Sequence, residues 1–418
     1  MIINIRANNS YVFSSDIELS LKADMRHKKF AYNVYRENNF NVLKSLGIYG
    51  PNNVGKTCLL KCIRNIRNIL LNKSPDVSSN IFNDSNIVEL GVTFLESGKK
   101  FTYDFKFNTK EKEFIYEKFS LINKDKYGNE KEELKLLRDS ENKKYFFEDK
   151  IIENMMKLTS KNNILIYLID ETEIKSFESI KSTLIAFASS IDYVDMNNIP
   201  IQKTIDLLKN KNNIKEKIVN FIINADLDIE NFQYIEDSLL SVKLPKDYSE
   251  KAEEKSLHIP EQQMDQIRLT SVYKGISVPS MLFDSTGTKK IVALSSYIID
   301  ALEKGRILII DELDSSIHFK LARAIVSMFN NELNTNAQLI FSVHDINLMD
   351  CKKLFRKEQI WFIHKDKKGV YLYSLADFTA EDGIRDTTNI IEKYRKGLLG
   401  ALPDPNLIES LLEVEHGK

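Results

Sequence analysis

The feature that most constrains the fold of this chain is the segment Gly50-Pro-Asn-Asn-Val-Gly55-Lys56-Thr57, which matches the pattern G-x-x-x-x-G-K-[ST]. The apolar run 42–49 precedes it, and apolar residues follow it at helical spacing from 55 to 71. A glycine turn that matches the pattern by chance would not need these flanking elements. The sequence therefore predicts an α/β fold in which the loop joins a buried strand to a helix.

Loops of this kind hold phosphate groups. Their glycines let backbone N–H groups surround a phosphate, and the following helix directs its positive end toward it. The lysine reaches the terminal phosphates, and the Ser or Thr hydroxyl binds Mg²⁺. We therefore expect a nucleotide-phosphate site, with Thr57 also a magnesium ligand, formed by Gly50, Asn52, Asn53, Val54, Gly55, Lys56, Thr57 and Cys58.

A second motif, Ile307-Leu-Ile-Ile310-Asp311-Glu312, is an apolar strand that ends in two carboxylates. Ligands of α/β proteins bind at the carboxyl ends of such strands. We expect Asp311 to hold Mg²⁺ and Glu312 to act as general base or to position the attacking water. The alternative is a strand that ends in two solvated acids, and the phosphate loop elsewhere in the chain argues against it.

Motifs of several other enzyme classes are not in the sequence. The base-reading pattern [NT]-K-x-D is missing, which argues against a Ras-like GTPase and favours ATP. The patterns G-x-S-x-G, H-E-x-x-H and C-x-x-C are missing too, so serine hydrolase, zinc protease and thiol redox functions have no support. The three cysteines, Cys58, Cys62 and Cys351, indicate neither a disulfide framework nor a structural zinc site.

Composition limits the partners and the compartment. The 418 residues include 59 Lys and Arg against 60 Asp and Glu, a net charge of −1, so attraction to nucleic acid would require a local basic surface. No apolar stretch reaches 18 residues, and the start, MIINIRANNS, lacks the apolar core of a secretory signal. We expect a cytoplasmic protein that does not associate with membranes.

Periodicity divides the chain into four parts. Residues 1–122 are predicted as ATPase lobe I, with the phosphate loop and an antiparallel meander at 87–95, 101–107 and 114–122. Residues 123–262 are predicted as a mostly helical insert. In 263–375, ATPase lobe II, strands alternate with helices, as in a parallel sheet covered on both faces. Residues 376–418 form a C-terminal tail.

In this order, the motifs resemble those of ABC/SMC/RecF-type ATPases, specifically AAA15-type ATPases related to bacterial anti-phage and abortive-infection proteins. The resemblance implies a P-loop NTPase fold of ABC/SMC-like type, with a mixed sheet, an antiparallel β subdomain and an inserted helical lobe. It also implies ATP and Mg²⁺ as cofactors. One departure is the Q-loop glutamine that ABC-type ATPases use after the first lobe, because the first glutamine here is Gln202.

The resemblance assigns roles to further residues. Ser285, Thr286 and Gly287 occupy the place of the signature motif, facing the γ-phosphate held by a second copy of the chain. Asp314 matches the D-loop, and His344 matches the switch histidine that senses the γ-phosphate. A plain Ser-Thr-Gly turn and a structural histidine are the simpler interpretations, but the order of the motifs favours the family roles. For His318, which also matches a family position, we expect packing at a helix start.

These roles imply a homodimer or higher homo-oligomer. The family implies a sensor or regulator in anti-phage defence that controls a separate effector protein, a nuclease or a toxin. A RecF-like DNA-repair ATPase and an ATP-bound scaffold for a protein partner are the alternatives. DNA is a further possible partner, and the candidate contacts, weighed against the usual role of charged runs as solvated faces, are Lys289, Lys290, Lys352, Lys353, Arg356, Lys357, Lys365, Lys367 and Lys368.

Overall fold

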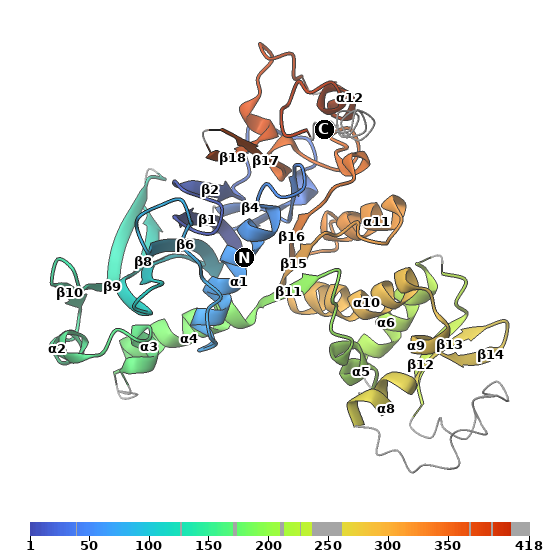
Figure 1. Ribbon diagram of the computed structural model, residues 1–418, viewed down its shortest axis with the longest axis horizontal. Helices are drawn as coiled ribbons and strands as arrows, with labels where there is room; N and C mark the ends of the chain where they lie inside the picture. The colour runs from blue at the N-terminus through green and yellow to red at the C-terminus, as the bar shows by residue number, and fades with distance from the viewer. Residues whose placement is uncertain are drawn as a thin grey trace, which may run out of the picture. The chain divides into compact units, whose positions relative to one another are not determined.

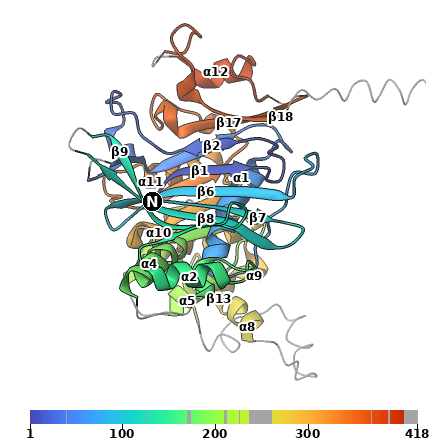
Figure 2. The same ribbon diagram turned by 90° about the vertical axis from the view of Figure 1, so that its left-hand side faces the viewer.

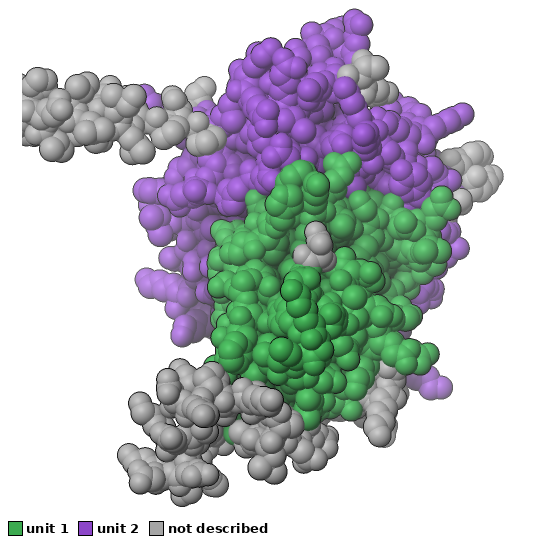
Figure 3. Space-filling view, turned by 90° about the vertical axis from the view of Figure 1, so that its right-hand side faces the viewer, with its two compact units in different colours: residues 1, 190–340 green, residues 2–189, 341–418 purple. Residues whose placement is uncertain are grey.

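The chain forms two compact units in the structure, a computed structural model. Unit 1 comprises residue 1 and Ser190–Ile340, and unit 2 comprises Ile2–Ser189 and Phe341–Lys418 (Figure 3). The described residues are 1–38, 40–125, 128–169, 174–209, 213–225, 227–235, 261–367, 369–385 and 388–402. Lys368 and the predicted tail from 403 onward lie outside them.

Unit 2 contains a seven-stranded sheet in which neighbouring strands pair antiparallel (Figures 1 and 2). Several strands alternate buried and more accessible residues, as expected for a sheet covered on one face. The predicted meander at 87–122 is therefore confirmed. The strands lie in the order β10 (Lys144–Phe147), β9 (Glu130–Asp139), β8 (Glu113–Lys124), β7 (Lys99–Asn108), β6 (Ile87–Glu96), β1 (Ile2–Asn8) and β2 (Ile17–Ser20).

The predicted helical insert at 123–262 is wrong in part. Its first residues continue the antiparallel sheet through β9 and β10, and further strands follow later in the segment. The first half of β9 is exposed, with charged side chains on both faces, so the period-two signal of a half-buried strand is missing there. The units also divide the chain after Ser189 and Ile340, instead of at the boundaries expected from periodicity.

Unit 2 also holds the predicted strand, loop and helix. Strand β5 (Ser45–Tyr49) is buried at every residue and runs parallel to β17 (Ile360–Asp366), which pairs with the antiparallel β18 (Gly369–Ser374). Helix α1 (Lys56–Leu70) begins directly after Gly55 and buries its apolar side chains. A buried strand therefore leads through the glycine loop into a helix.

The other elements of unit 2 are one hairpin, four α-helices and short 3₁₀ turns among the described residues. Helix α4 packs on the large sheet, with the rings of Phe187 and Phe94 stacked at 3.9 Å between centroids. The elements are β3 (Val34–Glu37), β4 (Phe40–Leu43), α2 (Lys150–Leu158), α3 (Leu165–Leu168), α4 (Lys175–Ser189), α12 (Ile390–Arg395), η1 (Ala31–Asn33), η2 (Ile346–Leu348), η3 (Lys357–Gln359) and η4 (Leu375–Asp377).

Unit 1 contains the second predicted strand and its helices. Strand β15 (Ile307–Asp311) pairs in parallel with β11 (Ile191–Asp195), from Ile191 opposite Ile307 to Asp195 opposite Asp311. Strand β16 (Gln338–Ser342) begins in unit 1 and its last two residues belong to unit 2. Helices α10 (Thr286–Lys304) and α11 (Phe319–Phe329) precede β15 and β16, as predicted. The α/β class is thus confirmed.

A smaller lobe of unit 1 packs against α10. Its elements are α5 (Gln202–Lys209), α6 (Asn213–Ile223), β12 (Asn231–Tyr234), α8 (Glu261–Ile267), β13 (Leu269–Tyr273), β14 (Ile276–Pro279) and α9 (Ser280–Phe283). Strand β14 ends at Pro279, and the helical turn α9 follows it directly.

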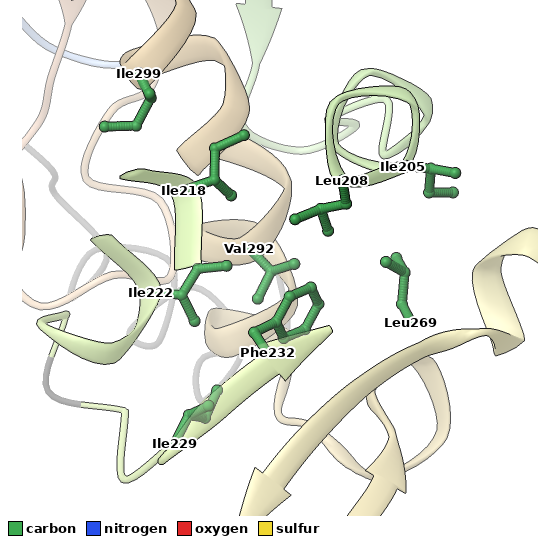
Figure 4. Close-up of a cluster of buried hydrophobic side chains, with 9 residues drawn as sticks. All are labelled: Ile205, Leu208, Ile218, Ile222, Ile229, Phe232, Leu269, Val292 and Ile299. Carbon is green, nitrogen blue, oxygen red and sulfur yellow. The ribbon is translucent and has the colours of Figure 1, made fainter. Parts of the chain in front are cut away.

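Nine buried apolar side chains join this lobe to α10 (Figure 4). Val292 and Ile299 of α10 face side chains from the lobe, with Phe232 of β12 among them. Thr204 adds polar contacts, because its hydroxyl donates to the Ala293 carbonyl at 3.1 Å and lies 2.9 Å from the Ser296 hydroxyl. The apolar burial and these hydrogen bonds hold α10 firmly to the lobe.

Candidate nucleotide site

The loop between β5 and α1 has a glycine at each end, and at both positions the backbone conformation and the neighbouring atoms leave no room for a side chain. Gly50 has a φ of +151°, and a Cβ there would lie 2.4 Å from the Ile363 carbonyl oxygen. Gly55 caps α1 with a φ of +118°, and its Cβ would lie 2.6 Å from the Val12 Cγ2 atom. Any side chain at these positions would meet strained backbone and occupied space. The two motif glycines thus define the path of the loop.

Lys56 lies at the centre of this loop. Its side chain is buried, and Nζ donates to the carbonyl oxygens of Gly50 at 2.6 Å and Pro51 at 2.9 Å. Nζ also lies 3.3 Å from Nδ1 of His344, which accepts the hydrogen bond from the ammonium. The structure therefore brings together two predicted site residues that are 288 positions apart.

The other predicted loop residues differ in exposure. Asn52 and Asn53 are exposed, and Asn53 has a left-handed backbone with a φ of +61°. Val54 is buried, so it anchors the loop. Thr57 and Cys58 are half-buried in the first turn of α1, whose N-terminal N–H groups suit an anion.

The two carboxylates of the second motif lie in unit 1 at the end of β15. Asp311 is buried, and its Oδ2 accepts a long 3.5 Å hydrogen bond from the Tyr193 hydroxyl. Its backbone carbonyl accepts from the Met196 N–H at 3.1 Å. Glu312 follows with a left-handed φ of +59°, an uncommon conformation for a residue with a Cβ. Such local strain, held by the surrounding structure, is typical of functional sites.

Asn197 is a site residue that sequence analysis missed. Its amide Nδ2 donates to Glu312 Oε2 at 2.9 Å, and its Oδ1 accepts from the Ser315 hydroxyl at 3.3 Å. It follows β11, which the sequence analysis placed in a helical insert. The run Ile191-Asp-Tyr-Val-Asp195 was a usable signal, because it is a short strand ending in an acid, as β15 is.

The predicted signature segment begins helix α10. The Ser285 hydroxyl caps this helix by accepting from the Thr288 N–H at 3.1 Å, and Thr286 is the exposed first helical residue. Asp284, which is buried just before it, accepts from the hydroxyls of Ser271 at 2.7 Å and Ser280 at 2.6 Å. These hydrogen bonds hold in place the residue that directly precedes the helix cap.

The signature segment contacts the turn after β15, which holds the half-buried Asp314. A Cβ on Gly287 would lie 2.9 Å from the Ser316 carbonyl oxygen, so only glycine allows this approach. Lys290 donates to the hydroxyls of Ser315 at 3.2 Å and Ser316 at 3.1 Å. Lys290, one of the candidate DNA contacts named above, thus holds the two segments together.

A hollow of about 500 Å³ opens beside these segments in unit 1. Its lining includes Ser285, Gly287, Ser316, His318 and Lys320. His318 caps α11, since its Nδ1 accepts from the Lys320 N–H at 3.3 Å. Two helix starts therefore face one hollow, an arrangement that favours an anionic ligand.

The predicted residues fit Mg²⁺ only in part. The described residues contain no group of three or more His, Cys, Asp or Glu side chains that could hold a metal ion. Thr57, in unit 2, and Asp311, in unit 1, each offer one oxygen ligand, and proteins usually bind magnesium with few protein ligands together with phosphate oxygens and water. Within the described part of the chain, no helix is long and apolar enough to cross a membrane.

Comparisons with known proteins add a family and two similar structures. A family profile described as "AAA domain, putative AbiEii toxin, Type IV TA system" matches residues 45–350. No curated protein matches the chain. An SMC head domain from Thermotoga maritima is 12% identical over 89% of this chain and 98% of its own, with a TM-score of 0.42. An SMC head bound to the C-terminal winged-helix domain of ScpA is 9% identical over 89% and 97%, with a TM-score of 0.41.

Proposed function

The chain belongs to the AAA-domain family that includes AbiEii-type proteins, as its motifs predicted, and we propose that it is an ATPase of abortive infection that binds and hydrolyses ATP with Mg²⁺. The observation that carries the proposal is the loop geometry, in which Lys56 lies between the loop carbonyls and His344. That ammonium can exchange carbonyl partners for phosphate oxygens, which bind it more strongly because they are charged.

In this proposal each unit contributes to the reaction. The loop N–H groups and Lys56 bind the phosphates, while Thr57 and Asp311 hold Mg²⁺. Glu312 accepts a proton from the attacking water, and Asn197 fixes the Glu312 carboxylate through the 2.9 Å bond. His344, in contact with Lys56, responds to the γ-phosphate. The joint use of both units rests on the order of the motifs along the chain.

A second copy of the chain completes the site in this proposal. Ser285, Thr286 and Gly287 lie at the start of α10, Asp314 lies in the turn that contacts it, and the Ser285 and Thr286 residues are exposed. A γ-phosphate bound to the partner's loop would suit this positive helix end. ATP would then favour the assembled state, and hydrolysis would release it.

The biological role that we propose is regulation of an effector in anti-phage defence, with the effector a separate nuclease or toxin. Support for a defence role comes from the family description, "putative AbiEii toxin, Type IV TA system", and the separate effector rests on the resemblance to anti-phage ATPases. ATP-driven assembly offers a physical basis, because a dimer can present a surface that single copies lack.

The experiment is ATP turnover by wild-type protein and Glu312→Gln, with the mass of each in solution measured with and without ATP. We expect Glu312→Gln to bind ATP, to lose nearly all turnover and to accumulate as an ATP-bound dimer, since only the proton acceptor is changed. Normal turnover by Glu312→Gln would disprove the role of Glu312. Absence of ATP binding by the wild-type protein would disprove the proposed function as a whole.

A further inference from the structure

An exposed basic surface lies in unit 2, formed by two segments that are more than 320 residues apart in the sequence. One segment, 26–29, reads Arg-His-Lys-Lys and is exposed throughout. The other carries the exposed Lys352 and Lys353 and the half-buried Lys357. We call residues 26–29 with 352, 353 and 357 the basic surface. Only its second segment is among the candidate DNA contacts predicted from the sequence.

A buried arginine holds the two segments together. Arg356 is 4% exposed, and its guanidinium donates to the carbonyl oxygens of Asp24 at 2.6 Å, His27 at 3.0 Å and Lys29 at 2.8 Å. The Lys29 ammonium donates in turn to the Cys351 carbonyl. These bonds fix the main chain of segment 26–29 beside the second segment.

The carboxylates near the surface are already engaged. Asp24 pairs with Arg26 at 2.6 Å, and Glu358 pairs with Arg356 at 2.8 Å. Asp350 accepts from the backbone N–H groups of Lys352 at 2.9 Å and Lys353 at 3.1 Å. Lys28, Lys352 and Lys353 form no ion pair within the described part of the chain. The surface is therefore locally cationic on a chain whose net charge is −1.

The shape of the surface favours phosphate groups. A pocket of about 40 Å³ lies between the segments, and its charged lining comprises Lys29, Arg356, Lys357 and Arg385 together with Glu358, the carboxylate that pairs with Arg356. That volume is enough for a few water molecules or phosphate oxygens and too small for a nucleobase. Tyr32, which follows segment 26–29 in the chain, is 42% exposed, and its ring packs edge-on against the ring of Phe30.

We infer that the basic surface binds the phosphate backbone of a nucleic acid. Lysine and arginine side chains at several positions neutralise successive phosphates, and each contact releases counterions. The inference goes beyond ATP hydrolysis and does not depend on it, because none of these lysines belongs to the proposed nucleotide site. Tyr32 makes unpaired bases the expected preference, since exposed aromatic rings stack on them.

The test is binding of labelled oligonucleotides, as single-stranded DNA, double-stranded DNA and single-stranded RNA of one sequence, at several salt concentrations. The variant is Lys28→Ala/Lys352→Ala/Lys353→Ala. We expect its binding to be about 10- to 100-fold weaker at 0.1 M salt, with a salt slope lower by about 2 to 3. Lys28→Ala alone and Lys352→Ala/Lys353→Ala should each give part of the loss.

The matched control is Lys110→Ala/Lys131→Ala/Lys144→Ala, which removes three exposed lysines of the same unit outside the surface. It should bind within about twofold of wild type. Unchanged melting temperature and ATP binding would show that both variants are folded. Equal losses in variant and control, or no binding of any oligonucleotide by wild type at low salt, would overturn the inference. ATP binding without oligonucleotide binding would leave the proposed ATPase intact.

Discussion

At the scale of single residues, the hydrogen bond from Asn197 to Glu312 gives a specific prediction. Asn197→Ala should lower ATP turnover by about 10- to 100-fold, because a hydrogen bond to a charged group contributes about 1.5–3 kcal/mol. ATP affinity should change little, since in the proposed mechanism Asn197 acts on Glu312 and not on the phosphates. Turnover and ATP binding would be measured on the same preparations.

Asn198→Ala is the control for this variant, because Asn198 is an exposed neighbour of the same type. It should keep wild-type turnover. Equal effects of both substitutions would mean that the turn after β11 matters as a whole, and that the bond from Asn197 to Glu312 has no role of its own.

The phosphate loop gives a second prediction. Gly50→Ala should destabilise unit 2 and abolish ATP binding, because its Cβ would lie 2.4 Å from a backbone oxygen that cannot move aside. Strained backbone of this kind costs about 1–3 kcal/mol before the clash is counted. Gly128→Ala separates the two effects, because Gly128 also has a positive φ, +85°, but nothing lies within 4 Å of its Cβ. Thermal unfolding of both variants, with and without ATP, would distinguish the effect of backbone strain from the effect of the clash.

The sequence predicted the strand, glycine loop and helix around Lys56 well because their determinants are contiguous. Glycines, lysine, strand and helix all lie within 30 residues, so local pattern suffices. It could not place Lys290, whose role depends on Ser315 and Ser316 across a turn. Nor could the sequence show the hydrogen bonds between Arg356 and segment 26–29, which join residues more than 320 positions apart. Contacts of this kind follow from packing, which a single sequence does not display.

At the scale of elements, a buried ion pair joins β8 and β9 to the segment before α3. Glu117 and Arg138 are each 1% exposed and pair directly, and Glu117 also accepts from the Tyr103 hydroxyl at 2.9 Å. Arg138 donates further to the carbonyls of Ser160 at 3.1 Å and Asn163 at 2.9 Å. Strand β9, which sequence analysis did not predict, is thus fixed by polar contacts that hydrophobic periodicity cannot reveal.

Arg138→Met should destabilise the protein by about 3–5 kcal/mol, because it leaves a buried carboxylate without its countercharge. Burial raises the pKa of Glu117, and the charge of Arg138 opposes that rise. Without Arg138 the pKa rises further, so stability falls as pH increases from the ordinary glutamate value toward this raised one. The loss, measured by denaturant unfolding, should be larger at pH 8 than at pH 5. Glu117→Gln/Arg138→Met should remove this pH dependence, and its persistence would contradict the assignment.

At the scale of the whole molecule, the parallel strands that carry the two nucleotide motifs were predicted, and the division into units was not. The motifs end apolar strands, which periodicity identifies. The unit boundaries depend on the lobe of α5, α6 and β12, whose side chains converge on α10 through Val292 and Ile299 (Figure 4). A helix and a lobe distant in sequence thus share one core, so composition shifts along the chain do not mark their border.

Assembly gives the last prediction. If each ATP is held by the loop of one copy and the signature segment of another, two inactive variants can complement each other. Lys56→Ala removes the phosphate-binding ammonium, and Gly287→Arg blocks the start of α10, where even a Cβ lies 2.9 Å from the Ser316 oxygen. Random pairing of equal amounts gives half of the dimers one intact composite site, so turnover should recover to about a quarter of wild type. A site contained in one copy predicts no recovery.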